Sequence, residues 1–212
     1  MKTLIVSATY NEISNLINKL DLKKETYILY KSNTIDVLIS GIGSAFTIYN
    51  LTEHLQKHNY NLIINVGIAG AFNKNLNIGD TVIVNSDCFA DLGIDDNGNF
   101  KTLFEEKLIS KKINLQFENN ISLQKLPKVK SITVNTASGS EQKIELLVKK
   151  FNPDIETMEG ASVTFIANKK NIPIIQIRTI SNYVEPRNKS NWNINLAITN
   201  LNNVLIKLPI AK

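Results

Sequence analysis

The stretch "NLIINVGIAGAF" (residues 61–72) decides the fold that the sequence predicts. It contains Leu62, Ile63, Ile64 and Val66, a mostly apolar run that is typical of a strand buried on both faces of a parallel sheet. Gly67 and Gly70 follow this run. Glycines at the end of a buried strand let a ligand approach backbone N–H and C=O groups closely. The stretch therefore predicts a central strand that ends at a binding site.

Similar apolar runs recur along the chain and alternate with segments of helical periodicity. They predict strands at residues 3–8, 26–30, 35–41, 80–93 (a strand and its exit), 129–138 and 172–181. The helical pattern covers residues 11–20, 44–58, 140–151, 159–171 and 192–207. Residues 95–128 are weakly patterned, and we expect loops there with a short helix near Leu103–Ser110. This alternation predicts one α/β domain over residues 1–212, a three-layer αβα arrangement around a mostly parallel mixed sheet.

The composition excludes several classes of protein. The net charge of +5 is spread along the chain and forms no basic stripe, so we expect no nucleic-acid partner. No apolar stretch approaches the ~20 residues that span a bilayer, so no membrane association is expected. The single cysteine, Cys88, cannot form an intramolecular disulfide and fits a reducing compartment. A cytoplasmic location is expected.

Two carboxylates occur at the starts of predicted helices, one after the first predicted strand and one after a short segment. Ligands of parallel α/β sheets bind outside the carboxyl ends of the strands, and this rule singles out "SATYNE" and "TMEG" among other segments. Glu12 and Glu159 lie in these two segments and could share acid, base and sugar-hydroxyl duties. Each could instead only complement a helix dipole, a role that spacing does not exclude.

Other motifs carry weaker signals. The segment "GIGSAF" (41–46) lacks the third glycine of a dinucleotide fingerprint, so we expect it to turn a strand tightly into a helix. His54 and His58 are spaced for one helix face but have no third metal ligand in reach by sequence. No metal and no cofactor are therefore expected.

Three segments together resemble one family: "NVGIAGAF", "IETMEGAS" and "IRTISNYVE". Their order and spacing are similar to those of the purine nucleoside phosphorylase and nucleosidase superfamily. Within it, "ISNYVEPRNKSNWNINLAI" (180–198) most resembles the bacterial futalosine hydrolases of the menaquinone pathway. The resemblance implies a nucleoside phosphorylase-like fold, a nucleoside substrate and a homodimer or higher homo-oligomer.

The resemblance also implies a role for each matched position. Glu12 corresponds to the carboxylate that holds and deprotonates the attacking water, Arg178 to an arginine near that water and the sugar, and Glu159 to the residue that binds the ribose hydroxyls. The other implied substrate contacts are Met158 on the sugar, Ile68, Ala69 and Gly70 along the glycosidic bond, Thr136 and Ala137 at the base, and Ser181 beside Asn182.

Asn182 stands where adenine-specific relatives carry Asp. An Asp can protonate purine N7 and accept from an exocyclic amine. An Asn cannot act as an acid, but its NH₂ group can donate to both N7 and O6 of a 6-oxopurine. Leaving O6 unsatisfied in a closed pocket would cost roughly 1–3 kcal/mol. Asn182 therefore favours hypoxanthine or guanine as the leaving base.

The two arginines favour hydrolysis over phosphorolysis. A phosphorylase must hold phosphate, for which bidentate arginine is preferred, but the residue before "VGIAG" is Asn65 and Glu12 would repel phosphate. With Arg178 assigned to the sugar, only Arg187 remains. Arg187 and Lys189 could meet the carboxylate on the 5′ arm of futalosine or could simply be exposed charges.

The sequence thus predicts hydrolysis of futalosine, with water as nucleophile, to hypoxanthine and dehypoxanthine futalosine. Two alternatives stay open at this point. One is another nucleosidase or phosphorylase acting on inosine-type or methylthioadenosine-type nucleosides. The other is a catalytically silent nucleoside-binding protein.

Overall fold

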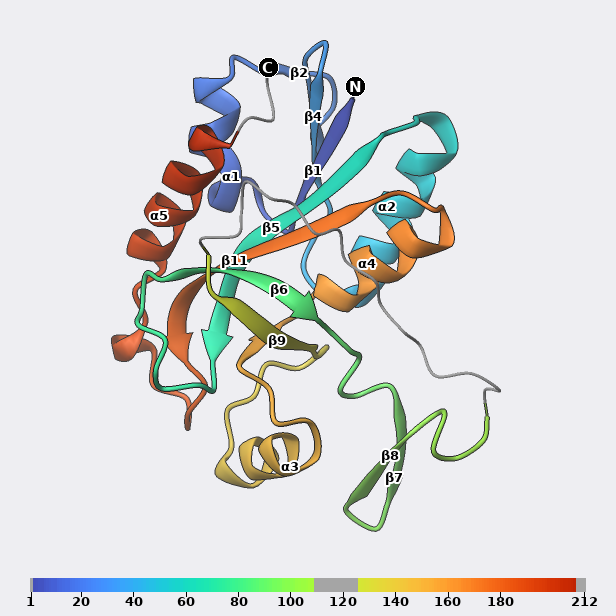
Figure 1. Ribbon diagram of the computed structural model, residues 1–212, viewed down its shortest axis with the longest axis vertical. Coiled ribbons are helices and arrows are strands. Elements are labelled where there is room, and N and C mark those ends of the chain that lie inside the picture. Colours follow the sequence, from blue (N-terminus) through green and yellow to red (C-terminus); the bar gives the residue numbers. More distant parts are fainter. Residues whose placement is uncertain (1, 109–125, 209–212) are drawn as a thin grey trace.

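A nine-stranded mixed sheet lies at the centre of the molecule, with helices on both faces (Figure 1). The computed structural model describes residues 2–108 and 126–208. The strand order is β10-β9-β6-β11-β5-β1-β4-β3-β2. Strands β1 (Thr3–Ser7), β4 (Ile35–Ile39), β5 (Leu62–Ala71) and β11 (Ile174–Tyr183) run parallel and form its middle. The predicted αβα architecture and mixed sheet are confirmed.

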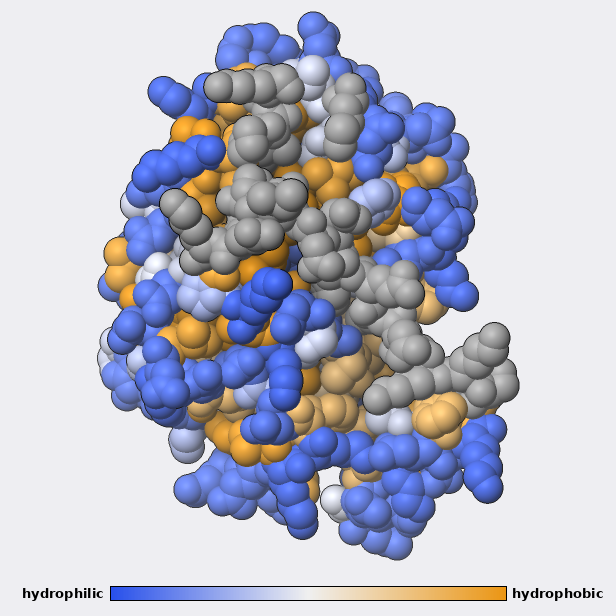
Figure 2. All heavy atoms as spheres, viewed as in Figure 1, coloured by the Kyte–Doolittle hydropathy of each residue, from blue (hydrophilic) through white to orange (hydrophobic). Residues whose placement is uncertain are grey.

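Two pairs of helices cover the two faces. Helices α1 (Tyr10–Lys19) and α5 (Ile194–Lys207) pack on one face, and α2 (Ser44–Lys57) and α4 (Gly160–Lys169) on the other (Figure 1). Each pair buries its own apolar cluster against the sheet, one including Ile13 and Leu201, the other Leu51 and Val163. On the face drawn in Figure 2, apolar atoms gather over the middle and hydrophilic side chains surround them.

One half of the sheet closes into a ring. Strand β10 (Ile155–Thr157) pairs in parallel with β9 (Lys128–Thr133) and antiparallel with β5, while β6 (Thr81–Ser86) joins β9 to β11. The interior is filled by small and branched apolar side chains, namely Ala69, Ala71, Leu76, Val82, Val84, Val129, Ile155 and Ile180. Helix α3 (Glu141–Phe151) contributes Leu147 to a separate cluster next to β9. The ring brings β10 beside the carboxyl end of β5, although the two are distant in sequence.

The segment that we expected to form loops differs from the prediction. Strands β7 (Gly93–Asp96) and β8 (Asn99–Thr102) form a hairpin around Asn97 and Gly98, both with positive φ. An Asn-Gly pair between two short strands is a strong hairpin signal that the weak apolar pattern concealed. The expected helix at Leu103–Ser110 is wrong as far as Leu108, because residues 103–107 form turns and Lys107 has φ 58. Its remainder lies outside the described residues.

Other boundaries moved by a few residues. The strand expected at 26–30 is confined to β3 (Leu29–Lys31), which pairs with the two-residue β2 (Lys23–Lys24). Helix α5 begins at Ile194 rather than Trp192, because the Asn193 side chain accepts from the Leu196 N–H at 3.1 Å and caps the helix there. A short 3₁₀ helix, η2 (Lys189–Asn191), precedes it.

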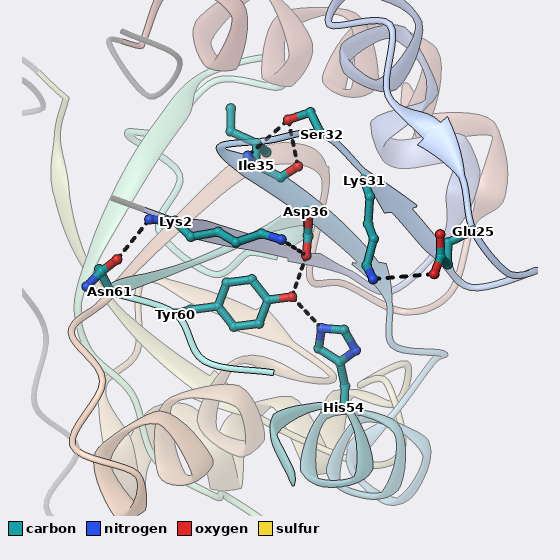
Figure 3. A network of polar contacts seen from close by, with 9 residues as sticks. All are labelled: Lys2, Glu25, Lys31, Ser32, Ile35, Asp36, His54, Tyr60 and Asn61. Carbon is teal, nitrogen blue, oxygen red and sulfur yellow. Dashed lines mark hydrogen bonds and ion pairs between the residues drawn. The ribbon is translucent and has the colours of Figure 1, made fainter. Parts of the chain in front are cut away.

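A polar network is buried at the amino ends of the parallel strands (Figure 3). Asp36 on β4 is fully buried and forms an ion pair with Lys2 at 2.9 Å. The Tyr60 hydroxyl donates to Asp36 at 2.6 Å. Because its one proton is used in that bond, the hydroxyl oxygen accepts from Nε2 of His54 at 2.7 Å. These contacts tie α2, β4 and the entrance to β5 together. None of the helices in the described residues is long and apolar enough to cross a membrane.

Candidate active site

A cavity of about 810 Å³ opens at the carboxyl ends of the parallel strands. Its walls come from α1, the end of β5, β10, the start of α4, the end of β11 and the start of α5. This is the sheet edge at which parallel α/β proteins bind ligands, as the sequence predicted. The volume suits a small-molecule ligand.

Glu12 is held in the wall of this cavity by backbone and hydroxyl donors. Its Oε2 accepts from the Thr9 N–H and the Thr9 hydroxyl, each at 2.9 Å, and its Oε1 accepts from the Ile68 N–H at 3.1 Å. Its own backbone carbonyl accepts from Asn202 of α5 at 2.9 Å. The carboxylate is therefore fixed between the first turn of α1 and the end of β5, with lone pairs left for a ligand.

Gly67 makes room for two charged groups above β5. A methyl group in place of its hydrogen would lie 2.9 Å from Glu12 Oε1 and would clash with Nη1 of Arg178. The two side chains thus converge on one point of the strand. Arg178 is 2% exposed, and its Nε and Nη2 atoms have no hydrogen-bond partner among the described residues. Burial lowers the pKa of this guanidinium, while Glu159, Glu12 and Asp87 act to retain its charge.

Glu159 occupies the N-cap position just before α4, but its side chain makes no capping hydrogen bond. The N–H groups of Gly160 and Ala161 instead donate to the hydroxyls of Thr157 and Thr133, at 3.3 and 2.8 Å. This leaves the Glu159 carboxylate free to line the cavity, where its Oε1 accepts from the Gly43 N–H at 2.8 Å. Burial raises the pKa of the Glu159 carboxyl, and the Arg178 guanidinium acts in the opposite direction. Capping by other residues makes this carboxylate available to a ligand.

Behind the cavity wall lies a further carboxyl group. Asp87 accepts from the Thr133 hydroxyl at 3.1 Å and from the Gln176 amide at 3.2 Å. Burial raises its pKa to about 6, against the effects of these donors and of Arg178. Asp87 is not among the residues that line the cavity, but its charge favours the charged form of the Arg178 guanidinium.

The orientation of the Asn182 amide follows from its two neighbours. Its Nδ2 donates to the Tyr183 carbonyl at 2.9 Å, and its Oδ1 accepts from the Ser181 hydroxyl at 2.7 Å. A carbonyl can only accept, so the Tyr183 oxygen determines which side of the amide carries nitrogen. One N–H is used in that bond and one remains. Both N–H groups of Asn182 were expected to donate to the base, and the structure leaves one of them available.

Most of the expected site residues meet in the cavity. It is lined by Glu12, Ile68, Ala69, Gly70, Ala137, Met158, Glu159, Ser181 and Asn182. Thr136 is not among its lining residues, and the Thr136 carbonyl accepts from Lys143 at 2.6 Å instead. Arg178 is not among the lining residues; it lies beside Glu12 over Gly67.

Sequence reasoning missed several contributors. Thr9 and Gly43 act through backbone or hydroxyl groups. Ser138, Glu156 and Trp192 also line the cavity, although they lie next to or within segments that the sequence comparison had already marked. A polar residue at position 156, between the apolar Ile155 and the helix-capping Thr157, was the one available signal. Within residues 2–108 and 126–208, no group of three or more His, Cys, Asp or Glu is placed to hold a metal ion.

Comparison with known proteins identifies the family. A family model described as the phosphorylase superfamily matches residues 3–208. The chain belongs to the phosphorylase superfamily. This confirms the resemblance drawn from the three sequence segments.

Individual relatives in the superfamily are nucleosidases. The 5′-methylthioadenosine/S-adenosylhomocysteine nucleosidase of Buchnera aphidicola subsp. Baizongia pistaciae is 30% identical over 227 residues, covering 98% of this chain and 88% of the relative. The futalosine hydrolase of Acidothermus cellulolyticus is 27% identical over 187 residues, covering 84% and 76%. These similarities support an enzyme of the N-glycosidase type, as expected.

The solved structure of Helicobacter pylori futalosine hydrolase has the same fold. It superposes with a TM-score of 0.83 over 97% of this chain and 96% of that chain, at 19% identity. At this level of identity the match concerns the fold alone.

Proposed function

We propose that this superfamily member hydrolyses the N-glycosidic bond of futalosine and releases hypoxanthine. The observation that carries the proposal is the Asn182 amide, whose orientation is set by the Tyr183 carbonyl. Asn182 lines the cavity, and its remaining N–H can donate to N7 or O6 of a 6-oxopurine. An Asp at this position would place an ionised oxygen against the same carbonyl unless it were protonated.

The proposed reaction divides the work among three side chains. Water held by Glu12 attacks C1′ as the C1′–N9 bond breaks, and Glu12 takes a proton from that water. Glu159 accepts from the ribose hydroxyls. The bonding electrons of the broken bond pass to the base, and the Asn182 N–H stabilises that charge until the base takes a proton from solvent.

The charge of the cavity wall favours water over phosphate. Three carboxylates line it, from Glu12, Glu156 and Glu159, and its described lining includes no lysine or arginine. The buried Arg178 already faces two of these carboxylates. Asn65, where a phosphorylase would offer a cation, is 1% exposed and does not line the cavity. An incoming phosphate dianion would meet net negative charge.

The cavity rim offers a place for the 5′ arm. Trp192 and Ile194 line the cavity, and the exposed guanidinium of Arg187 lies 5.7 Å from the centre of the Trp192 ring. We assign the aromatic part of the futalosine arm to Trp192 and its carboxylate to Arg187. This arrangement supports a long, acidic 5′ substituent more than a short neutral one.

A second candidate is hydrolysis of 5′-methylthioadenosine or S-adenosylhomocysteine. It is favoured by the 30% identity to the Buchnera nucleosidase, which exceeds the 27% identity to the futalosine hydrolase of Acidothermus. The argument from Asn182 opposes it, because adenine presents an amine rather than O6. The two candidates differ in the base that is released.

The experiment that tests the proposal is base release by the purified protein. Futalosine, aminofutalosine, inosine and methylthioadenosine are each supplied with and without phosphate, and released bases are separated by chromatography. Hypoxanthine from futalosine, independent of phosphate, is the expected result. Adenine release as the main activity would establish the second candidate, and release only with phosphate would contradict hydrolysis. Binding without release would indicate a silent nucleoside-binding protein.

We also propose that the protein acts as a homodimer. Ile42, Phe46 and Tyr49 lie at the start and along α2 with 57%, 66% and 68% of their surface exposed, and Ile42 also lines the cavity. A second copy covering these side chains would close the cavity from that side. Light scattering of the purified protein measures its mass, and a monomer would contradict the proposal.

A further inference from the structure

One buried carboxylate in the cavity wall has no role in the chemistry above. Glu156 lies on β10 and is 7% exposed. The Ser138 N–H donates to its Oε1 at 2.9 Å, and the Ser138 hydroxyl donates to its Oε2. An ionised carboxylate offers about four acceptor positions, so both oxygens can accept further hydrogen bonds.

The closed ring of strands places this carboxylate opposite Asn182. Gly70 of β5 is in register with Glu156 on one side and with Asn182 on the other. Residues in register on neighbouring strands project to the same face of a sheet. Since adjacent strands lie ~4.8 Å apart, the two backbones are separated by ~10 Å across Gly70.

Gly70 leaves the space between these side chains open. A methyl group on Gly70 would lie 3.3 Å from Nδ2 of Asn182 and 2.9 Å from Val184, so the amide lies above this glycine. Glu156, Gly70 and Asn182 all line the cavity. The result is a slot with a hydrogen-bond donor on one side and an acceptor on the other.

The polarity of the slot matches one edge of a 6-oxopurine. Such a base presents N7 and O6 as acceptors and, next to O6, the N1–H as a donor. Adenine presents N7 as an acceptor, its exocyclic amine as a donor and N1 as an acceptor. Adenine would therefore set its N1 lone pair against the carboxylate and its amine against the amide donor.

We propose that Glu156, held by Ser138, is a specificity-determining residue that accepts a hydrogen bond from N1–H of a 6-oxopurine. This assignment rests on the nucleosidase function proposed above and names the edge of the base that the site reads. Burial raises the pKa of the Glu156 carboxyl, while the two Ser138 donors and Lys143 act to lower it and so favour the ionised acceptor. The Ser138 contacts also fix the side chain before substrate arrives.

The test uses 1-methylhypoxanthine, which keeps N7 and O6 but lacks the N1–H. Calorimetry measures binding of hypoxanthine and of 1-methylhypoxanthine to the full chain. We expect methylation to weaken binding by about 10- to 100-fold, because the carboxylate is left facing a methyl group. In Glu156→Ala the same comparison should differ by less than about 3-fold, because the acceptor and the side chain that the methyl group would face are both gone. The control Glu145→Ala, at an exposed glutamate on α3, should behave as the wild type.

The outcomes separate this assignment from the choice of substrate. Equal binding of both bases by the wild type would overturn the role of Glu156, even if the variant failed to fold. The role of Glu156 would also be overturned if the control variant, too, bound hypoxanthine and 1-methylhypoxanthine equally well. If binding depends on N1–H but futalosine is not cleaved, futalosine is not the substrate and the role of Glu156 stands. If futalosine is cleaved but binding does not depend on N1–H, the proposed substrate stands and the role of Glu156 is wrong.

Discussion

The two ends of the parallel strands bury charge in different ways. At the amino ends, Asp36 has direct partners in Lys2 at 2.9 Å and the Tyr60 hydroxyl at 2.6 Å, although its Oδ1 has none (Figure 3). At the carboxyl ends, Arg178 is buried with Nε and Nη2 unpartnered, and no ion pair between described residues includes it. The Asp36 carboxylate is thus paired through one of its oxygens, whereas the Arg178 guanidinium has no ion-pair partner among the described residues.

The difference separates a stabilising cluster from a functional one. A buried polar group without a partner costs about 1–3 kcal/mol, so proteins retain such groups where a ligand completes them. The Asp36 network joins three elements and lies away from the cavity. We therefore expect substitutions at the cavity to change catalysis more than stability, and substitutions in the network to do the opposite.

The largest effect is expected for Glu12→Gln. The amide cannot take a proton from water, so kcat for base release should fall by about 10²- to 10⁴-fold with little change in KM. Steady-state assays on the best nucleoside measure both constants. Thermal unfolding shows whether the fold is retained, and Glu145→Gln serves as the exposed control. Undiminished kcat in a folded variant would exclude Glu12 as the base.

Arg178→Met tests the unpartnered guanidinium. If this cation stabilises charge at the proposed sugar site, its removal should reduce kcat/KM by about 10²-fold. Because Nε and Nη2 make no hydrogen bonds to described residues, the loss of folding stability should be smaller than for a paired buried charge. Urea denaturation and steady-state kinetics on the same preparation give the two numbers. A large loss of stability with activity retained would make Arg178 a structural residue.

Asp36→Asn tests the opposite end. The Tyr60 hydroxyl and Lys2 lose an anionic partner, so the free energy of unfolding should fall by about 1–3 kcal/mol. The cavity is not touched, so kcat/KM should change by less than about twofold. Urea denaturation monitored by circular dichroism measures the first quantity. Loss of activity at unchanged stability would break the comparison between the two ends.

Most of the architecture follows from the sequence because the buried strands are long apolar runs. Strand β5 and helix α4 lie close to where their patterns placed them. The ring closure was not predictable, because the pairing of Glu156 with Gly70 joins residues far apart in the chain and leaves no local pattern. The strands of the hairpin at 93–102 are too polar to show the apolar pattern of buried strands. Only the Asn-Gly turn indicated a hairpin there.

The parts of the candidate site formed by side chains could be predicted from the sequence, but the parts formed by backbone groups could not. Glu12, Glu159 and Asn182 follow strand ends and could be found by position. The donors that hold the two carboxylates, the N–H groups of Ile68 and Gly43, carry no residue-type signal. Glu156 was overlooked because it lies within a three-residue strand, in the segment "IETMEGAS" in which Met158 and Glu159 drew attention.

The smallest expected effect concerns the pH dependence of the Asp36 network. Burial and the neighbouring His58 lower the pKa of His54 from 6.5 to about 4, while Asp36 acts in the opposite direction. Between these two values the unfolded chain takes up a proton that the folded protein does not, so stability decreases as pH falls through that window. In His54→Gln the difference in unfolding midpoint between pH 7 and pH 5 should shrink. An unchanged difference would assign the acid sensitivity to other groups.

The closed ring of strands also affects whether sheets of two molecules can pair through their edges. Because β10 pairs with both β9 and β5, the described nine-stranded sheet has one open edge, at β2. That edge is two residues long and consists of the exposed Lys23 and Lys24. A short lysine edge repels a second strand and offers few backbone groups to pair with. Edge-to-edge aggregation through this apolar-rich sheet is thus blocked at both borders, by pairing at one and by charge at the other.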